Sequence, residues 1–252
     1  MKIELLYPEV TGLYGDLFNM EYLRRSVPGC GVASTSFGER PRFLDDKTID
    51  LVYMGSMTER SQLLVLDELA PIRGEIWDAI ERRQRFLITG NAIEIFGNRI
   101  IENSELKASE IGDEGYECLS LFDFHVERNM LKKENSLFLG KYILTETDAI
   151  EVVGFQSRFG RGVYGPSAPE PLFKVERGPG FLPDRSGEGL MYKGFMATYN
   201  TGPLLILNPA FLVRLCWEMG YAGVAPAHMD AAMDAYRKRL YQFSNPDTGF
   251  ED

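Results

Sequence analysis

Short apolar segments alternate with helical ones through the first third of the chain, and this order restricts the possible folds more than any other feature. Residues 17–26 and 60–83 carry apolar side chains at helical spacing, and Pro71 divides the second stretch into two predicted helices. Strands are predicted at residues 2–7, 31–37, 50–54 and 86–88, and the short apolar run at 50–54 is of the kind that a parallel sheet buries on both faces. Strands joined through helices require right-handed crossovers. We therefore predict an α/β fold, a three-layer sandwich with a mostly parallel central sheet.

The second half of the chain changes character and predicts a β-rich extension of this sandwich. Residues 100–153 show shorter strand and turn signals, with acidic loops at 102–117. Proline and glycine cluster between residues 160 and 189, which predicts long loops over the surface. Residues 188–199 return to an apolar, strand-like pattern.

Two helices and a polar segment are predicted at the end of the chain. The first helix covers residues 209–219 with Asn208 as its N-cap, and the second covers about 227–241. Residues 243–252 form a polar tail that we expect to be flexible. The rest, residues 1–242, is long enough to bury one large core and is expected to form a single domain.

Composition excludes several classes of function. The chain has 252 residues with 37 acidic and 27 basic side chains, a net charge of −10, which does not attract nucleic acid or anionic lipid. It has no apolar run of membrane-spanning length and no signal-peptide pattern, so we expect a cytoplasmic protein. The three cysteines lie far apart without metal-ligand spacing and are expected to be buried hydrophobes: Cys30, Cys118 and Cys216. No cofactor and no metal are expected.

The segment FLITGNAIEIFG at residues 86–97 indicates a buried strand, a sharp turn and a helix. Hydrolases use this geometry to present a nucleophile, and the residue at the turn here is Thr89. The same pattern also fits a plain strand-to-helix junction in which Gly90 eases the turn. This segment alone does not distinguish a nucleophile turn from a plain strand-to-helix junction.

Five segments together support a family resemblance: LYPEVTGLYGDLFN near the start, DLVYMGSMTERSQ at 50–62, LITGNAIEIFG at 87–97, VGFQSRFGRG at 153–162 and EGLMYKGFMATYNTGPLLILNP at 188–209. In order and spacing the chain resembles the class I glutamine amidotransferases of the cobyric acid synthase type. The nearest group is the glutaminase subunits of lipid II isoglutaminyl synthases. The LYGD opening is the most specific of these signals, and the resemblance implies the flavodoxin-like fold of that family.

The resemblance also implies which positions carried the chemistry. The family's nucleophile turn reads approximately Cys-Gly-Gly-Tyr-Gln, and its base lies in Gly-Thr-Tyr-Leu-His-Gly-Pro. Thr89 stands at the cysteine position and Thr201 at the histidine position, while Ile93 replaces the glutamine. Two further family segments match in part, and the pocket that the resemblance implies is lined by Gly55, Ser56, Gln62, Gly90, Asn91, Gln156 and Arg158.

These replacements argue against glutamine hydrolysis. The reaction needs a thiolate and a paired base, and a threonine hydroxyl inside a chain has neither the acidity nor a terminal amine to activate it. His125 and His228 are the only histidines, neither matches the base position, and a structural or surface role is expected for both. The turn would still direct backbone N–H groups and a helix N-terminus at a small carboxylate or amide ligand. Glu94 is expected to complement the helix dipole rather than to contact that ligand.

Three functions follow as alternatives. The preferred hypothesis is a catalytically silent amidotransferase-like subunit that docks on a partner. The resemblance implies a Mur-ligase-like or other ATP-dependent synthetase, because the chain has no GxxxxGK[ST] loop of its own. The second is an active amidohydrolase or amidotransferase that uses Thr89 or another nucleophile. The third is a small-molecule binding module that works alone.

Overall fold

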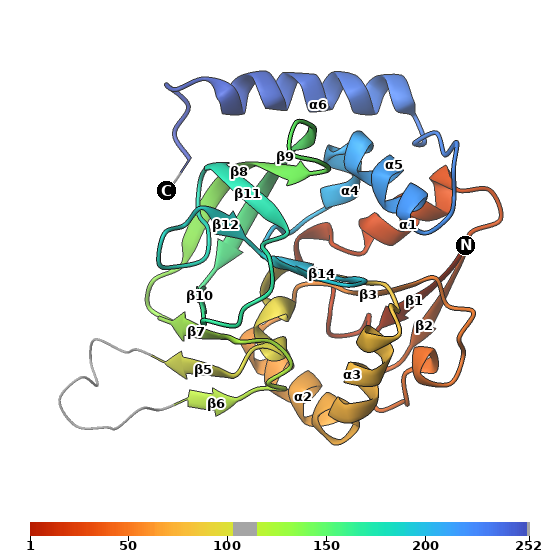
Figure 1. The fold of residues 1–252 in the computed structure, drawn as a ribbon, viewed down its shortest axis with the longest axis vertical. Helices are drawn as coiled ribbons and strands as arrows, with labels where there is room; N and C mark the ends of the chain where they lie inside the picture. Colours follow the sequence, from red (N-terminus) through yellow and green to blue (C-terminus); the bar gives the residue numbers. More distant parts are fainter. Residues whose placement is uncertain (103–114, 251–252) are drawn as a thin grey trace.

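A six-stranded sheet lies at the centre of the computed structural model, which describes residues 1–102 and 115–250 (Figure 1). Every pair of neighbouring strands in this sheet is parallel except β13 and β14 at one edge. The predicted mostly parallel sheet is therefore confirmed. From one edge to the other, the strands are β13 (Leu190–Tyr192), β14 (Phe195–Thr198), β4 (Phe86–Thr89), β3 (Leu51–Met54), β1 (Lys2–Leu6) and β2 (Gly31–Thr35).

Helices cover both faces of the central sheet, because alternate strand residues point to opposite sides. In β3, Val52 and Met54 belong to the core that includes α2 and α3, whereas Leu51 and Tyr53 belong to the core that includes α1 and α5. Pro71 lies in a 3₁₀ turn that separates α2 from α3, as predicted. The helices are α2 (Glu59–Leu69) and α3 (Arg73–Glu81) on one face, and α1 (Phe18–Ser26), α4 (Leu204–Leu207) and α5 (Pro209–Glu218) on the other.

Two smaller sheets form the predicted β-rich extension. One contains, in order, β10 (Gly160–Tyr164), β7 (Phe124–Arg128), β5 (Arg99–Glu102) and β6 (Gly115–Glu117). The other contains β12 (Gly187–Glu188), β11 (Phe173–Arg177), β8 (Glu134–Ile143) and β9 (Ala149–Arg158). Most of the acidic loop predicted at 102–117 lies outside the described residues.

The prediction of long loops between residues 160 and 189 is wrong in part, because β10, β11 and β12 lie there. These strands are short and lie between proline and glycine turns, so their two-residue alternation is weak in the sequence. Phe173 in β11 is fully buried and anchors its strand in the core beneath α5.

Asn208 stands at the N-cap position of α5, but its side chain makes no capping hydrogen bond. Its amide group instead pairs with the backbone of Val153 in β9, accepting from the N–H at 2.8 Å and donating to the carbonyl at 2.8 Å. The predicted N-cap position is therefore confirmed, but the side chain does not cap the helix, because a strand distant in sequence binds it instead. The contact fastens the extension to the central domain.

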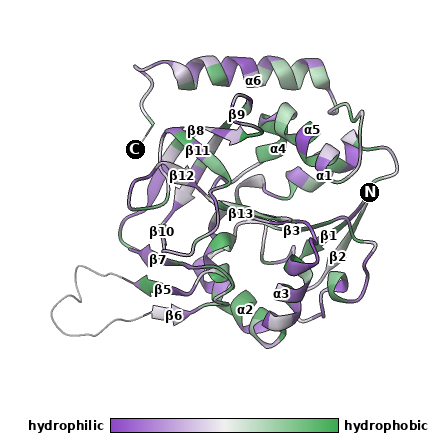
Figure 2. Ribbon diagram, in the orientation of Figure 1, coloured by the Kyte–Doolittle hydropathy of each residue, from purple (hydrophilic) through white to green (hydrophobic). Residues whose placement is uncertain are grey.

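The last helix, α6 (Met229–Ser244), lies over the β8–β9 hairpin (Figure 1). Hydrophobic and hydrophilic residues alternate along it (Figure 2), and the Tyr236 hydroxyl donates to the carbonyl of Glu151 in β9 at 2.9 Å. Among the described residues, no helix is both long and apolar enough to cross a bilayer.

The segment after α6 contacts β8 and β11. The guanidinium of Arg177 in β11 donates to the carbonyls of Phe243 and Asn245, both at 2.6 Å, and of Thr248 at 2.8 Å. The same group lies 4.1 Å from the ring centre of Phe250, whose carbonyl accepts from the backbone of β8 at 2.8 Å. The segment predicted to be flexible is thus bound to β11 by the hydrogen bonds and the ring contact of Arg177.

We expect Arg177→Gln to release this segment, because three hydrogen bonds of a cation to carbonyls are lost together. Hydrogen exchange at the backbone amides of residues 245–250 should accelerate by about tenfold or more. Arg237→Gln, on the exposed face of α6, is the matched control and should leave those rates unchanged. If these amides already exchange at the rate of an unfolded chain in the unsubstituted protein, the tail is flexible and the Arg177 contacts do not hold it.

Candidate functional site

The turn after β4 is sharp, as predicted, but the helix that follows it is a 3₁₀ helix, Gly90–Phe96. Gly90 has a φ of +63°, and a Cβ there would lie 2.4 Å from the Cβ of Ser56, so only glycine fits. Its N–H donates to the carbonyl of Asn200 at 3.3 Å. The expected α-helix N-terminus is therefore absent from this turn, and its first N–H is already used within the protein.

The carboxylate of Asp16 lies between Thr89 and Thr201, the two positions that the resemblance assigned to nucleophile and base. Its Oδ2 accepts hydrogen bonds from the Thr89 hydroxyl at 2.9 Å and from the N–H of Ser56 at 2.6 Å. Its Oδ1 accepts from the Thr201 hydroxyl at 3.1 Å and from the N–H of Gly202 at 2.5 Å. One buried side chain therefore satisfies both threonines and two backbone donors.

Tyr53 and Asn19 complete this network from β3 and α1. The Tyr53 hydroxyl lies 2.8 Å from Thr89 Oγ1 and donates to the carbonyl of Asp16 at 2.9 Å. Asn19 donates to the Tyr53 hydroxyl at 3.0 Å and to the carbonyl of Gly202 at 3.1 Å. Hydroxyl, amide and carboxylate groups at the carboxyl ends of β3 and β4 are thus bound to one another.

Burial controls the electrostatics of the network. Removal of water raises the pKa of the Asp16 carboxyl above its usual value, although hydrogen bonds from Ser56, Thr89 and Gly202 oppose the shift. Burial likewise raises the pKa of Tyr53 well above its ordinary value. Thr89 is 0% exposed and Thr201 is 2% exposed. No substrate can reach either hydroxyl in this conformation.

The cysteines and histidines do not supply the missing groups. Burial raises the pKa of Cys118 to about 12 and of Cys216 to about 11, and it also raises the pKa of the Cys30 thiol. All three are therefore protonated thiols at neutral pH. His125 lies in β7 opposite a residue of β10, and His228 precedes α6.

A buried ion pair lies next to the turn. Glu94 of the 3₁₀ helix pairs with Arg128 at the end of β7, and both side chains are at most 2% exposed. Gln62 donates to the Glu94 carboxylate at 2.9 Å, and the Tyr199 hydroxyl donates to it at 3.2 Å. The expectation that Glu94 complements a helix dipole is wrong, because its carboxylate is neutralised by an arginine 34 residues away in the chain.

A second buried acid lies beyond Tyr199. The Glu188 carboxylate accepts from the Thr198 hydroxyl at 2.7 Å and from the Tyr199 N–H at 2.7 Å. Burial raises the pKa of Glu188 to about 7, although these hydrogen bonds and the charge of Arg158 oppose the shift. The Arg158 guanidinium lies 4.8 Å from the ring centre of Tyr199.

Comparison with known proteins supports the family resemblance. The chain is 24% identical over 217 residues to the GatD subunit of lipid II isoglutaminyl synthase (glutamine-hydrolyzing) from Streptococcus pneumoniae. This match covers 85% of this chain and 78% of the relative. It is 26% identical over 200 residues to the GatD subunit from Staphylococcus aureus, and the match covers 78% of this chain and 74% of the relative. The chain is therefore a homologue of GatD glutaminase subunits of lipid II isoglutaminyl synthase. No family model matches it.

A solved structure has a similar fold over nearly the whole chain. A chain in the structure of PurLQS from Thermotoga maritima superposes with a TM-score of 0.52 at 11% identity. The superposition covers 95% of this chain and 98% of that one. At this identity the likeness concerns the fold alone.

The residues of the predicted pocket belong to three separate buried clusters in the structure. Gly55, Ser56 and Gly90 surround the Asp16 carboxylate, and a Cβ on Gly55 would lie 2.9 Å from the Cβ of Asp16. Gln62 and Asn91 lie together, since Gln62 donates to the Asn91 carbonyl at 2.7 Å. Gln156 and Arg158 lie on β9 on the side of Glu188. Arg158 also borders an open cavity, described below.

Sequence reasoning missed Asp16, Arg128 and Glu188. Asp16 belongs to the LYGD segment that carries the resemblance most specifically, so an acid in that loop was a usable signal. Glu188 likewise is the first residue of the matching segment at 188–209. Arg128 had no such signal, because it lies in a short strand whose burial depends on distant partners. Within the described part of the chain, no group of three His, Cys, Asp or Glu side chains could hold a metal ion.

Proposed function

We propose that this chain is an amidotransferase-like subunit that does not hydrolyse glutamine and acts with an ATP-dependent, Mur-ligase-like synthetase in the amidation of a lipid II-type cell-wall precursor. The observation that carries the proposal is the position of Asp16. Its carboxylate occupies the space between Thr89 and Thr201, where an acyl-enzyme mechanism would need a nucleophile next to a base.

The chemistry of the site supports the absence of hydrolysis. Thr89 donates its only hydroxyl proton to Asp16, but this carboxylate also holds Ser56 and Gly202 through their backbone N–H groups. A base committed to fixed backbone donors is poorly placed to accept and pass on a proton during turnover. The site therefore favours a structural role for Asp16, and the Thr89 hydroxyl remains a weak nucleophile.

The relatives support a partner. Both curated relatives are named as subunits of a glutamine-hydrolyzing synthase, and they match this chain over at least 74% of their own length. The loop before α1 and the first residue of α1 expose apolar side chains next to the Asp16 network: Leu13 is 38% exposed, Tyr14 46% and Phe18 59%. Exposed aromatic residues are enriched at protein interfaces, so this loop suits a partner surface.

The test is release of ammonia from glutamine by the purified chain, alone and with the Mur-ligase-like protein of the same organism. We expect no release above that of a Thr89→Ala variant, with or without the partner. Turnover at rates normal for amidotransferases would overturn the proposal. Loss of such turnover in Thr89→Ala would instead establish an enzyme with a threonine nucleophile.

A companion variant tests whether the scaffold can be reactivated. Thr89→Cys combined with Thr201→His restores both reacting groups of the family, yet we expect little glutaminase activity. The Asp16 carboxylate would still separate the two side chains, and a buried site that is filled by threonine must accommodate a larger histidine. Thermal melting of the variant distinguishes an inactive folded protein from an unfolded one.

A further inference from the structure

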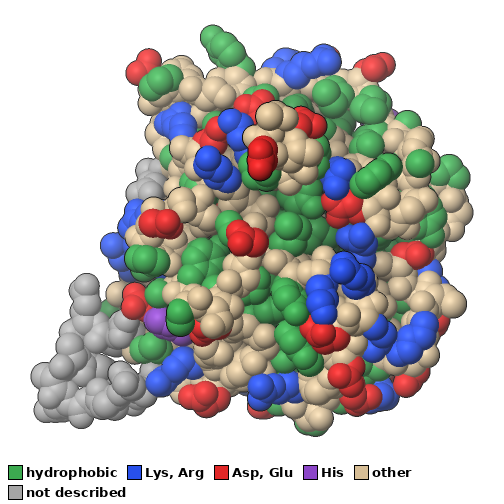
Figure 3. Space-filling model, viewed as in Figure 1, with side chains coloured by type: hydrophobic (Ala, Val, Ile, Leu, Met, Phe, Trp, Pro, Cys, Tyr) green, Lys and Arg blue, Asp and Glu red, His purple; other side chains and the backbone are tan. Residues whose placement is uncertain are grey.

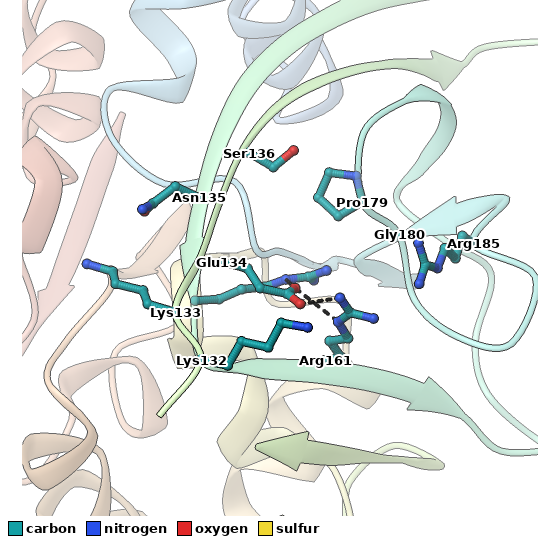
Figure 4. A pocket seen from close by; sticks show the side chains of 10 residues that line it. Lys132, Lys133, Glu134, Asn135, Ser136, Arg161, Pro179, Gly180 and Arg185 are labelled. Carbon is teal, nitrogen blue, oxygen red and sulfur yellow. Dashed lines mark hydrogen bonds and ion pairs between the residues drawn. The ribbon is translucent and has the colours of Figure 1, made fainter. Parts of the chain in front are cut away.

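A cavity of about 130 Å³ opens beside Arg158. Residues from the starts and ends of several strands and from the loop between β11 and β12 border it (Figure 4). Lys133 lies on one side of the view and Arg185 on the other, with Lys132, Glu134 and Arg161 between them. The cavity therefore draws on three separate segments of the extension.

Positive charge dominates the lining. Five cationic side chains and one carboxylate border the cavity: Lys132, Lys133, Arg158, Arg161, Arg185 and Glu134. The chain as a whole has a net charge of −10, and acidic and basic side chains are interspersed on the face drawn in Figure 3. Arg161 donates to Glu134 through Nε at 2.9 Å and is neutralised by it. The remaining cations have no comparable counter-charge within the lining.

Arg158 supplies an independent indication of a ligand. Its side chain is only 3% exposed, and its Nε and Nη1 atoms have no hydrogen-bond partner among the described residues. Its nearest carboxylate oxygen belongs to Glu134, 3.7 Å from Nε and beyond hydrogen-bonding distance. Buried donors of a guanidinium are costly when unpaired, so a group that fills the cavity and accepts from them would stabilise the protein.

We infer that this cavity binds a phosphate group through Arg158, Lys132 and Arg185. A doubly charged oxyanion matches the excess of positive charge better than a carboxylate does, and its oxygens fit the planar donor fork of arginine. A cavity of this size has room for several water molecules and therefore for one phosphate group. The site goes beyond the proposed function, and neither depends on the other.

Titration calorimetry of the full chain with inorganic phosphate tests the inference. We expect saturable binding of one phosphate in dilute buffer at neutral pH, and no comparable heat from acetate. Arg158→Gln should weaken binding by about tenfold or more, since charge-assisted hydrogen bonds are lost. Lys132→Gln and Arg185→Gln should each weaken it severalfold. Lys238→Gln, which removes an exposed cation of α6, is the matched control and should bind as the unsubstituted chain does.

Each possible outcome decides the matter. Absence of saturable phosphate binding, equal binding of acetate, or unchanged binding in both Lys132→Gln and Arg185→Gln would overturn the inference. The latter two variants alter exposed side chains, so they decide the test even if Arg158→Gln fails to fold. Methyl phosphate distinguishes two sources of the ligand: tighter binding than inorganic phosphate indicates the phosphoryl group of a larger molecule, and weaker binding indicates free phosphate.

Discussion

Asp16→Asn should lower the free energy of unfolding by about 3 kcal/mol, although the two side chains have nearly the same shape. The two backbone donors bind different oxygens, Ser56 N–H on Oδ2 and Gly202 N–H on Oδ1. An asparagine can present its oxygen to only one of them, so its NH₂ group must face the other donor in a buried site. Such a loss is a large share of the stability of an ordinary domain.

Urea unfolding at pH 7, followed by circular dichroism, measures this change. Asp67→Asn is the matched control, because Asp67 is an exposed residue of α2, and its substitution should change stability by less than about 0.5 kcal/mol. Equal midpoints for Asp16→Asn and the unsubstituted chain would show that the carboxylate does not organise the site. It would also remove the observation on which the proposed function depends.

The central domain was predictable because its signals are local. β3 and the first three residues of β4 are continuous apolar runs, and Pro71 separates two amphipathic helices at a fixed place. The extension was less predictable, since β10, β11 and β12 are short and lie among proline and glycine residues. Their pairing partners are set by tertiary contacts that no local window contains.

The candidate site was predictable in position but not in content. The strand and turn at Thr89 placed the site at the carboxyl end of β4, and Thr201 lies there as expected. Asp16 reaches the same point from a loop 73 residues before Thr89, a separation that spacing within the sequence cannot reveal. The ion pair of Glu94 was unpredictable for the same reason, since its partner Arg128 belongs to the extension and is distant in the sequence.

Glu188 should make the protein less stable as the pH rises from about 4.5 to about 7. Burial raises the pKa of Glu188 in the folded state to about 7, above its ordinary value of 4.5. In this range the folded state holds a proton that the unfolded state has released, so stability falls with increasing pH. The contribution is complete below pH 4.5 and lost above pH 7, and it amounts to on the order of 3 kcal/mol.

Glu188→Gln isolates this contribution from that of other buried acids such as Asp16. A glutamine keeps an oxygen for the Tyr199 N–H and cannot ionise, so the variant should be more stable than the unsubstituted chain at pH 8. The difference in the free energy of unfolding between the two proteins should shrink or change sign at pH 5. Urea unfolding at pH 5 and at pH 8 measures this difference. Glu146→Gln, at an exposed turn, should show the same difference from the unsubstituted chain at both pH values. Parallel pH profiles for the unsubstituted chain and Glu188→Gln would mean that Glu188 ionises in the folded state as freely as in the unfolded chain, with its charge balanced by Arg158.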